Sequence, residues 1–216
     1  MIERYHLQIL TKRMNEPRKF IQVILGPRQT GKTTLATQFL KKSSFPGIYE
    51  SADAVPAGNQ QWLEQIWETA RLKMKSLDVI ELILVIDEIQ KIPGWSDMVK
   101  KLWDEDSRND LKLKVVLLGS SRLLLQSGLI ESLAGRFETI YMGHWSFSEM
   151  KDAFNWNAEQ YAWFGRYSYA YPHRQTRIIK ATFRTWMPVF RPDSLPYKNT
   201  RPTTGCRQYH NLVSLS

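Results

Sequence analysis

The run from Gly26 to Thr33 has the spacing of a loop that holds phosphate groups. It reads Gly-Pro-Arg-Gln-Thr-Gly-Lys-Thr and fits the pattern G-x-x-x-x-G-K-[ST] at every fixed position. Glycines let the backbone curl so that successive N–H groups face one concavity at the start of a helix. Lys32 would reach the β- and γ-phosphates, and the Thr33 hydroxyl would be a ligand of Mg²⁺. We therefore expect bound Mg-nucleotide, held by Gly26, Pro27, Arg28, Gln29, Thr30, Gly31, Lys32, Thr33 and Thr34.

An acidic pair follows an apolar run that has the length of a buried strand. Residues 82–86 read Leu-Ile-Leu-Val-Ile, and Asp87 and Glu88 come directly after them. Ligands of parallel α/β sheets bind beyond the carboxyl ends of the strands, so Asp87 would stand near Thr33 and help to hold Mg²⁺. Glu88 could then polarise a water aimed at the γ-phosphate, as a general base. The alternative is that both carboxylates only cap the segment that follows.

The residues after Asp87 also separate two classes of nucleotide. A GTPase would be expected to have D-x-x-G after such a strand and an N/T-K-x-D clamp for guanine further along the chain. Here Glu88, Ile89 and Gln90 follow the aspartate, and the chain contains no such clamp. We therefore expect ATP rather than GTP.

Polar residues beyond the acidic pair are further candidates for contact with phosphate. Residues 113–118 form another apolar run, which ends in a Gly-Ser-Ser sequence. A hydroxyl at Ser120 or Ser121 could bind the attacking water or the γ-phosphate, although serine after glycine is also ordinary turn chemistry. Arg136, just before the fifth expected strand, could reach a phosphate of its own site or of a neighbouring subunit. The alternative for Arg136 is a surface ion pair with Glu138.

Apolar runs and helical periodicity alternate along the chain as far as residue 154. Continuous apolar runs are typical of strands buried on both faces of a parallel sheet, and the expected helices carry apolar residues at three- and four-residue spacing. Ser146 and Glu149 have the spacing of a capping box at the start of the last helix. The alternation predicts an α/β fold with helices on both faces of a parallel sheet. We expect strands at residues 20–25, 47–50, 82–86, 113–118 and 137–142, and helices at 3–15, from 32, at 60–76, 95–106 and 147–154.

The chain has a formal charge of +9, and the excess of basic residues lies at its C-terminal end. Residues 165–216 contain nine Lys and Arg against one acidic residue, whereas residues 1–164 contain 21 basic and 20 acidic side chains. The body of the protein is close to neutral, which argues against a nucleic-acid-binding surface there. Aromatic residues lie among the basic residues of the tail, so an arm that binds nucleic acid is an alternative for that segment.

Cysteine and histidine usage excludes other classes of site. Cys206 is the single cysteine, so an internal disulfide or a cysteine-based metal site cannot form. The four histidines lack the close spacing of metal ligands. The N-terminus is charged and lacks the apolar run of a signal peptide, and no stretch approaches the roughly 20 apolar residues that span a bilayer. We expect a cytoplasmic protein without a membrane partner.

The phosphate-loop, acidic, serine and arginine motifs, in this order along the chain, resemble those of the prokaryotic AAA+ ATPases. In these proteins the ATPase core precedes a separate C-terminal domain of uncharacterised function. The resemblance spans about residues 1–164, and it is carried by Gly26–Thr34, Leu84–Lys91, Gly119–Arg122, Leu133–Phe137 and His144–Glu149. It implies the additional-strand P-loop fold, a five-stranded parallel sheet with the strand order 5-1-4-3-2.

The resemblance also implies roles for particular residues. It implies a polar sensor at Ser120 or Ser121, and Arg136 matches the position of the arginine finger of the family. It implies hydrolysis of Mg-ATP through Lys32, Thr33, Asp87 and Glu88.

The chain departs from this family after residue 164. Members of the family are considerably longer and more helical, whereas residues 165–216 form a basic string that proline interrupts repeatedly. We expect an N-terminal helix at 1–18, an ATPase core at 19–145, the start of a helical segment at 146–164, and an irregular tail at 165–216. The hypothesis for the tail is that it is disordered, or read out of frame in a truncated gene product.

Three functions are compatible with these residues. The first is an ATPase module that acts as a homo-oligomer, on a protein partner or on DNA, because hydrolysis needs a mechanical outlet. The second is a nucleotide-binding module or truncated product without turnover. The third, less favoured, is a small-molecule kinase, since such enzymes share the P-loop but have no fixed need for a glutamate after Asp87.

Overall fold

The computed structural model describes residues 2–56, 59, 61–120 and 132–164. The chain divides into two units, residues 1–169 and 170–216, and every described residue belongs to the first. The basic tail, with its alternatives, therefore lies outside the described residues, as does Ser121. Within the described part, no helix has the length and apolar character that crossing a bilayer requires.

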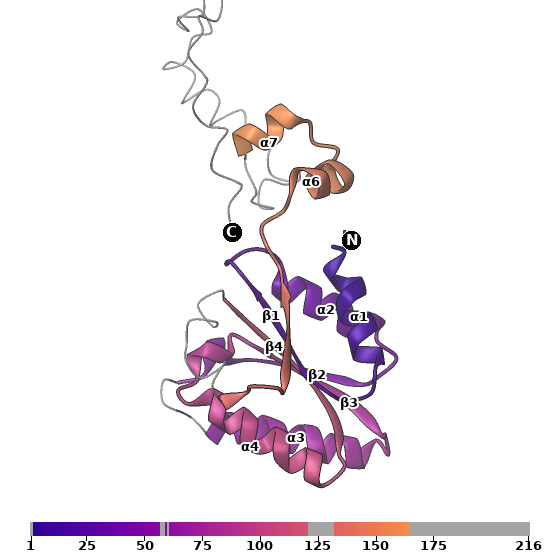
Figure 1. Ribbon diagram of the computed structural model, residues 1–216, viewed down its shortest axis with the longest axis vertical. Coiled ribbons are helices and arrows are strands. Elements are labelled where there is room, and N and C mark those ends of the chain that lie inside the picture. Colours follow the sequence, from indigo (N-terminus) through magenta and orange to yellow (C-terminus); the bar gives the residue numbers. More distant parts are fainter. Residues whose placement is uncertain (1, 57–58, 60, 121–131, 165–216) are drawn as a thin grey trace, which may run out of the picture. The chain divides into compact units, whose positions relative to one another are not determined.

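A five-stranded parallel sheet forms the centre of the fold (Figure 1). The strands lie side by side in the order β2-β3-β4-β1-β5, which confirms the expected order 5-1-4-3-2. The central strands β1, β3 and β4 are mostly apolar and are buried along nearly their whole length, because both faces of the sheet are covered. The strands are β1 (Ile21–Gly26), β2 (Gly47–Ser51), β3 (Glu81–Asp87), β4 (Lys112–Ser120) and β5 (Phe137–Tyr141).

Two pairs of helices cover the two faces of this sheet, as Figure 1 shows. One face packs against α1 (His6–Asn15) and α2 (Lys32–Lys42) through a core that includes Ile24. The other face packs against α3 (Gln61–Ser76) and α4 (Trp95–Arg108) through a core that includes Val23. Successive residues of β1 thus point to opposite layers, as the two-residue period of a strand requires.

In the described part of the chain, the helices α6 (Phe147–Phe154) and α7 (Ala158–Phe164) follow the sheet. The expected capping box is present: Ser146 accepts from the backbone N–H of Glu149, and the Glu149 carboxylate accepts from the backbone N–H of Ser146. The Tyr161 hydroxyl donates to the Trp145 carbonyl at 2.9 Å, which joins α7 to the segment before α6. Two short 3-10 helices, η1 (Ala52–Ala54) and η2 (Ile89–Lys91), follow β2 and β3.

Strand register brings the chemically interesting residues to one edge of the sheet. Gly26, the last residue of β1, lies opposite Ser120, the last residue of β4. Asp87 ends β3, which pairs with the other side of β4 so that Ile86 lies opposite Leu117. All strands run in the same direction, so their carboxyl ends form one edge, where parallel sheets place their ligands.

Candidate nucleotide-binding site

The loop from Gly26 to Lys32 connects the carboxyl end of β1 to the first turn of α2. Its curl depends on two left-handed residues, Gln29 with φ 64° and Gly31 with φ 92°. The first turn of α2 contains no acidic residue, and no side chain caps it. Its N–H groups and the positive end of the helix dipole are thus available to an anion, which is the physical requirement for a phosphate site.

Lys32 lies within this loop and is bound to it. The residue is 8% exposed, and its Nζ donates to the carbonyls of Gly26 at 3.0 Å and Pro27 at 2.7 Å. An ammonium group has three donors, so one N–H is left for a phosphate oxygen. Burial lowers the pKa of Lys32, while the charges of Glu88 and Asp87 act to raise it and Arg28 lowers it further.

Thr33, Asp87 and Tyr49 form a cluster of oxygen atoms beside the loop. The Thr33 hydroxyl donates to Asp87 Oδ2 at 2.6 Å, and the Tyr49 hydroxyl donates to the same oxygen at 2.8 Å. The other carboxylate oxygen of Asp87 accepts from the backbone N–H of Glu88 at 2.8 Å. Asp87 is only 4% exposed, and these three donors give both of its carboxylate oxygens hydrogen-bond partners in a buried position.

This donor set fits Mg²⁺ together with a nucleotide. A carboxylate and a hydroxyl are hard oxygen donors, and Mg²⁺ in nucleotide sites characteristically takes one or two protein ligands besides water and phosphate oxygens. Thr33 and Asp87 would hold the ion, and the backbone of the loop would hold the phosphates. In the part of the chain that the structure describes, there is no cluster of three or more His, Cys, Asp or Glu that could form an all-protein metal site.

Glu88 follows Asp87 in a left-handed conformation, with φ 53°. This conformation is uncommon for a residue with a side chain, and it turns the chain sharply at the end of β3. The Glu88 carboxylate is half-buried and accepts a hydrogen bond from the Gln90 amide. The structure thus places the candidate general base at the same edge as Lys32 and Asp87, with its carboxylate engaged by Gln90.

The remaining loop residues and the sensor candidate occupy different environments. Arg28, Gln29 and Thr34 are exposed. The Thr30 side chain is buried and donates to the Pro27 carbonyl at 3.1 Å. Ser120 is half-buried beside the first glycine of the loop.

Comparison with known families adds an independent observation. A family model described as an AAA domain matches residues 18–151. The chain belongs to this AAA domain family. No curated protein matched the chain. The matched residues include the whole sheet and the loop, acidic and serine positions described above, so this AAA domain has the nucleotide-binding architecture of an ATPase-like module.

Arg136 lies near the amino-terminal ends of the strands in the AAA domain, whereas the phosphate loop lies at their carboxyl ends. It precedes β5, and Phe137 lies opposite Ile21 at the start of β1. A strand rises about 3.3 Å per residue, so Gly26 is roughly 16 Å further along the sheet. This separation is beyond the reach of an arginine side chain. Arg136 therefore does not reach the phosphate loop of its own chain in this arrangement.

The expected alternative for Arg136, an ion pair with Glu138, is wrong. Arg136 pairs with Asp104 of α4, with Nε–Oδ1 at 2.7 Å and Nη2–Oδ2 at 3.0 Å. Glu138 instead pairs with Arg13 of α1 at 3.5 Å. Arg136 lies in the turn before β5, so the alternation of a strand does not place it beside Glu138.

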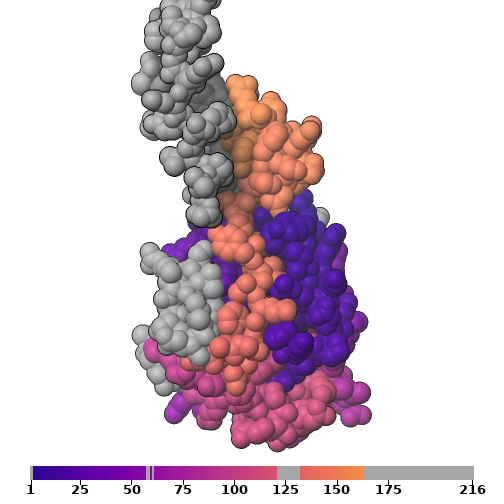
Figure 2. Space-filling view, viewed as in Figure 1, coloured from indigo at the N-terminus to yellow at the C-terminus, as the bar shows by residue number. Residues whose placement is uncertain are grey.

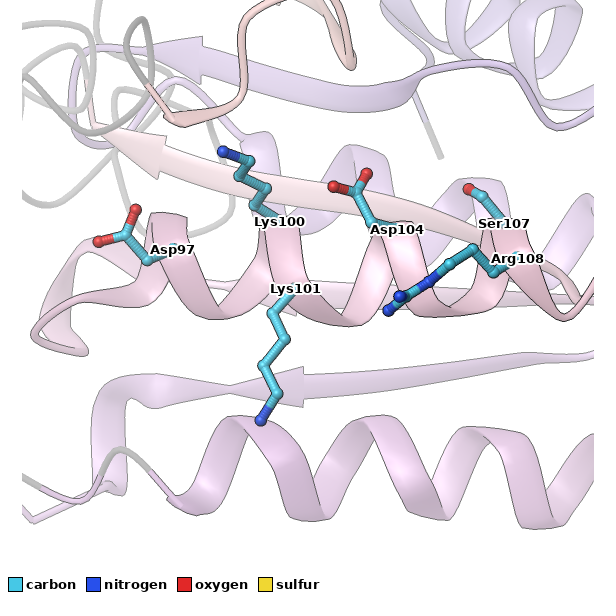
Figure 3. Close-up of a pocket in the computed structure, with 6 residues that line it drawn as sticks. All are labelled: Asp97, Lys100, Lys101, Asp104, Ser107 and Arg108. Carbon is cyan, nitrogen blue, oxygen red and sulfur yellow. The ribbon is translucent and has the colours of Figure 1, made fainter.

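Asp104 also lines a surface hollow of about 730 Å³ along α4 (Figure 3). Its lining residues are all polar or charged, and none belongs to the phosphate loop. They project from one helix, and Figure 3 shows Lys100 and Lys101 pointing in opposite directions. Lys101 donates to Glu64 of α3 at 3.0 Å. This hollow is therefore a solvated helix face of the AAA domain, separate from the candidate site.

Sequence reasoning did not identify Tyr49 or Gln90 as members of the site. Tyr49 lies on a strand that was expected, and the register of β2 with β3 places Ser51 opposite Asp87. Strand alternation puts Tyr49 on the same side as Ser51, so a long side chain there can reach the carboxylate. This signal depends on strand pairing, which the sequence does not give directly.

Proposed function

We propose that this AAA domain binds Mg-ATP and hydrolyses it to ADP and phosphate. The observation that carries the proposal is the hydrogen bond from Thr33 to Asp87, 2.6 Å long. It joins the helix that follows the phosphate loop to the strand that ends in Asp87. Such a pairing of hydroxyl and carboxylate is what Mg²⁺ coordination beside a phosphate requires.

Each residue would contribute a distinct step. The loop N–H groups and the remaining donor of Lys32 bind the β- and γ-phosphate oxygens. Bound Mg²⁺ would neutralise charge on those oxygens. Glu88 accepts a proton from the water that attacks the γ-phosphorus, and Ser120 orients that water or the γ-phosphate. For Glu88 to act, its carboxylate must leave Gln90 and turn toward the water.

Calorimetric titration with Mg-ATP, paired with an assay of phosphate release, tests this proposal. Wild-type chain is expected to bind and release phosphate, the Lys32→Ala variant to lose binding, and the Glu88→Gln variant to keep binding but lose turnover. A folded wild-type chain that does not bind Mg-ATP would refute the proposal.

A second candidate, a nucleotide-binding module without turnover, is favoured by the contact between Glu88 and Gln90. In that case wild-type chain and the Glu88→Gln variant would bind Mg-ATP equally, and neither would release phosphate. A small-molecule kinase would transfer the phosphate to an acceptor instead, so phosphate release without an acceptor distinguishes the ATPase from that third function.

The position of Arg136 supports action between subunits as part of the same proposal. Arg136 would complete the site of a neighbouring copy, after release from Asp104. An Arg136→Ala variant should therefore bind Mg-ATP normally and hydrolyse it more slowly in an assembled form. Equal turnover by this variant and by wild type, in a sample shown by sedimentation to be oligomeric, would exclude this role.

A further inference from the structure

Arg4 is a buried arginine that none of the sequence motifs includes. It precedes α1, and the residue is 7% exposed. Its guanidinium lies 4.9 Å from the centre of the Trp145 ring. Figure 2 shows the N-terminal segment in indigo beside the orange segment that follows β5. Burying a guanidinium is costly unless every donor has a partner, so its contacts carry information about its role.

The hydrogen bonds of Arg4 join two parts of the chain that are distant in sequence. Nη1 donates to the Thr30 carbonyl at 3.1 Å and to the Gly143 carbonyl at 2.9 Å. Nε and Nη2 donate to the two carboxylate oxygens of Glu149 at 2.9 and 3.1 Å. Thr30 belongs to the phosphate loop, whereas Gly143 precedes α6 and Glu149 lies in its first turn. A single side chain therefore connects the loop to the first turn of α6.

The Thr30 carbonyl has a particular importance for the loop. The peptide that joins Thr30 to Gly31 is planar, and in a trans peptide the C=O and N–H groups point in opposite directions. The hydrogen bond from Arg4 fixes the direction of this carbonyl, so the Gly31 N–H points away from Arg4. Left-handed residues precede and follow Thr30, and the bond from Arg4 is one of the contacts that fix the orientation of this peptide.

The contact of Arg4 with Glu149 is a charged pair that fixes the guanidinium on the side of α6. Burial opposes ionisation of Glu149, but hydrogen bonds from Arg4 and Ser146 outweigh it and keep its pKa below its ordinary value. Glu149 is thus a carboxylate near neutral pH, and a bidentate pair with arginine fixes orientation as well as distance. Glu149 also caps α6, so its own position is set by that helix.

We propose that Arg4 is a positioning residue of the phosphate loop, which aims the Gly31 N–H at the β-phosphate and couples nucleotide binding to the seating of α6. The proposal rests on the proposed function, because it concerns the same site. By linkage, a nucleotide that orders the loop strengthens the contact with α6, and that contact strengthens nucleotide binding to the same degree.

Calorimetry on the full chain tests the first part of this proposal. Replacement of Arg4 by Ala removes the donor to Thr30 and should weaken binding of Mg-ATP and Mg-ADP alike, by about tenfold, the value of one hydrogen bond to a charged group. Binding of AMP, which has no β-phosphate, should not change. Arg4→Lys, which can still donate to the two carbonyls, should recover part of the affinity.

Arg13→Ala is the matched control for Arg4→Ala. Arg13 also lies near the N-terminus and pairs with a residue of β5, Glu138, but it does not touch the loop. This control should bind nucleotide as wild type does. If folded Arg4→Ala also binds as wild type does, the proposal is wrong. If wild type itself binds nothing, the proposed function fails first, so the two failures are distinguishable.

Hydrogen exchange on wild-type chain tests the second part and needs no variant to fold. Mg-ATP is expected to slow exchange of the backbone N–H groups at Gly31 and, in parallel, at Glu149 and Met150 in the first turn of α6. Slowing at Gly31 with no change in α6 would contradict the connection through Arg4.

Discussion

The hydroxyl of Thr33 donates to the carboxylate of Asp87 at 2.6 Å, although the two residues are separated by 54 positions in the sequence. This length is typical of a hydroxyl donating to a carboxylate. It exists because β3 and β1 lie on either side of β4 and end at the same edge of the sheet. The two side chains proposed to hold Mg²⁺ are therefore already in contact in the protein itself.

Replacement of Asp87 by Asn should raise the Mg²⁺ concentration that nucleotide binding requires. The amide has the same shape but lacks the charge that attracts the ion, and its nitrogen cannot accept from Thr33. We expect the Mg²⁺ concentration at half-maximal ATP binding to rise about tenfold or more, since a hydrogen-bonded charge is worth ~1.5–3 kcal/mol. Titration of Mg²⁺ at fixed ATP measures this. Asp110→Asn, at an exposed aspartate in the turn before β4, is the control, and an equal midpoint for both variants would contradict the assignment.

Replacement of Tyr49 by Phe should also affect the proposed metal site, because Tyr49 donates to the same Asp87 oxygen as Thr33 does. Burial raises the pKa of Tyr49 above its ordinary value, and its hydrogen bond to Asp87 adds to this effect. The hydroxyl is therefore a neutral donor at every pH at which the protein would be assayed. Its loss should cost about 1 kcal/mol of folding free energy and should increase the Mg²⁺ requirement more than it changes metal-free ATP binding.

Chemical denaturation and Mg²⁺ titration of Tyr49→Phe would measure both effects. Tyr141→Phe is the control, because Tyr141 is 59% exposed and lies at the end of β5. A Tyr49→Phe variant with the same Mg²⁺ requirement as the control would show that Tyr49 stabilises the fold without tuning the metal site.

Local patterns predict the elements of this fold well. The apolar run at residues 20–25 becomes β1 at Ile21–Gly26, and the capping box at Ser146 and Glu149 starts α6. These features depend on residues near each other in sequence, so periodicity and capping chemistry are sufficient. The order of the strands came instead from the family resemblance, because no local pattern specifies which strands pair.

Contacts between distant residues account for what the sequence did not predict. Arg4 contacts Glu149, and Arg136 contacts Asp104 rather than the neighbouring Glu138. Both pairs depend on how the elements pack, which composition and spacing do not determine. The same holds for Tyr49, whose role near Asp87 follows only from the pairing of β2 with β3.

Replacement of Gly26 by Ala should destabilise the protein at the start of the phosphate loop. A Cβ atom at this position would lie 2.0 Å from the carbonyl oxygen of Met142. That oxygen is backbone, and Met142 is fixed by its N–H bond to the Leu25 carbonyl at 2.6 Å, so the chain itself must shift. We expect a loss of about 1–3 kcal/mol, the usual cost of an extra methyl group in a packed region, together with weaker ATP binding.

Gly143→Ala provides the comparison for Gly26→Ala by chemical denaturation. The nearest atom to a Cβ at Gly143 is a ring carbon of Tyr141 at 3.7 Å, which is an ordinary contact. This variant should stay within about 0.5 kcal/mol of wild type. Similar stability of the two variants would show that the segment after β5 does not constrain the loop.

His6 should make the stability of the protein depend on pH in the mildly acidic range. The residue is 3% exposed, and its Nε2 donates to the Tyr141 carbonyl at 3.1 Å. Burial lowers its pKa below 6.5, and the charge of Arg4 lowers it further, while the Tyr141 carbonyl and the charge of Glu149 oppose the shift. The unfolded chain thus binds a proton at a higher pH than the folded chain does.

The sign of the pH effect follows from this difference in proton binding. Stability is full above the unfolded pKa, close to 6.5, and decreases as pH falls from there toward the lower folded pKa, because the proton favours the unfolded chain. The Glu149 carboxylate contributes separately, since its lowered pKa acts only below about 4.5. Denaturation of wild type and of His6→Gln, which keeps an N–H donor, between pH 7.5 and 5.5 would measure the effect of His6. We expect wild type to lose more stability than the variant over this range, and parallel losses in the two proteins would rule out His6 as the source.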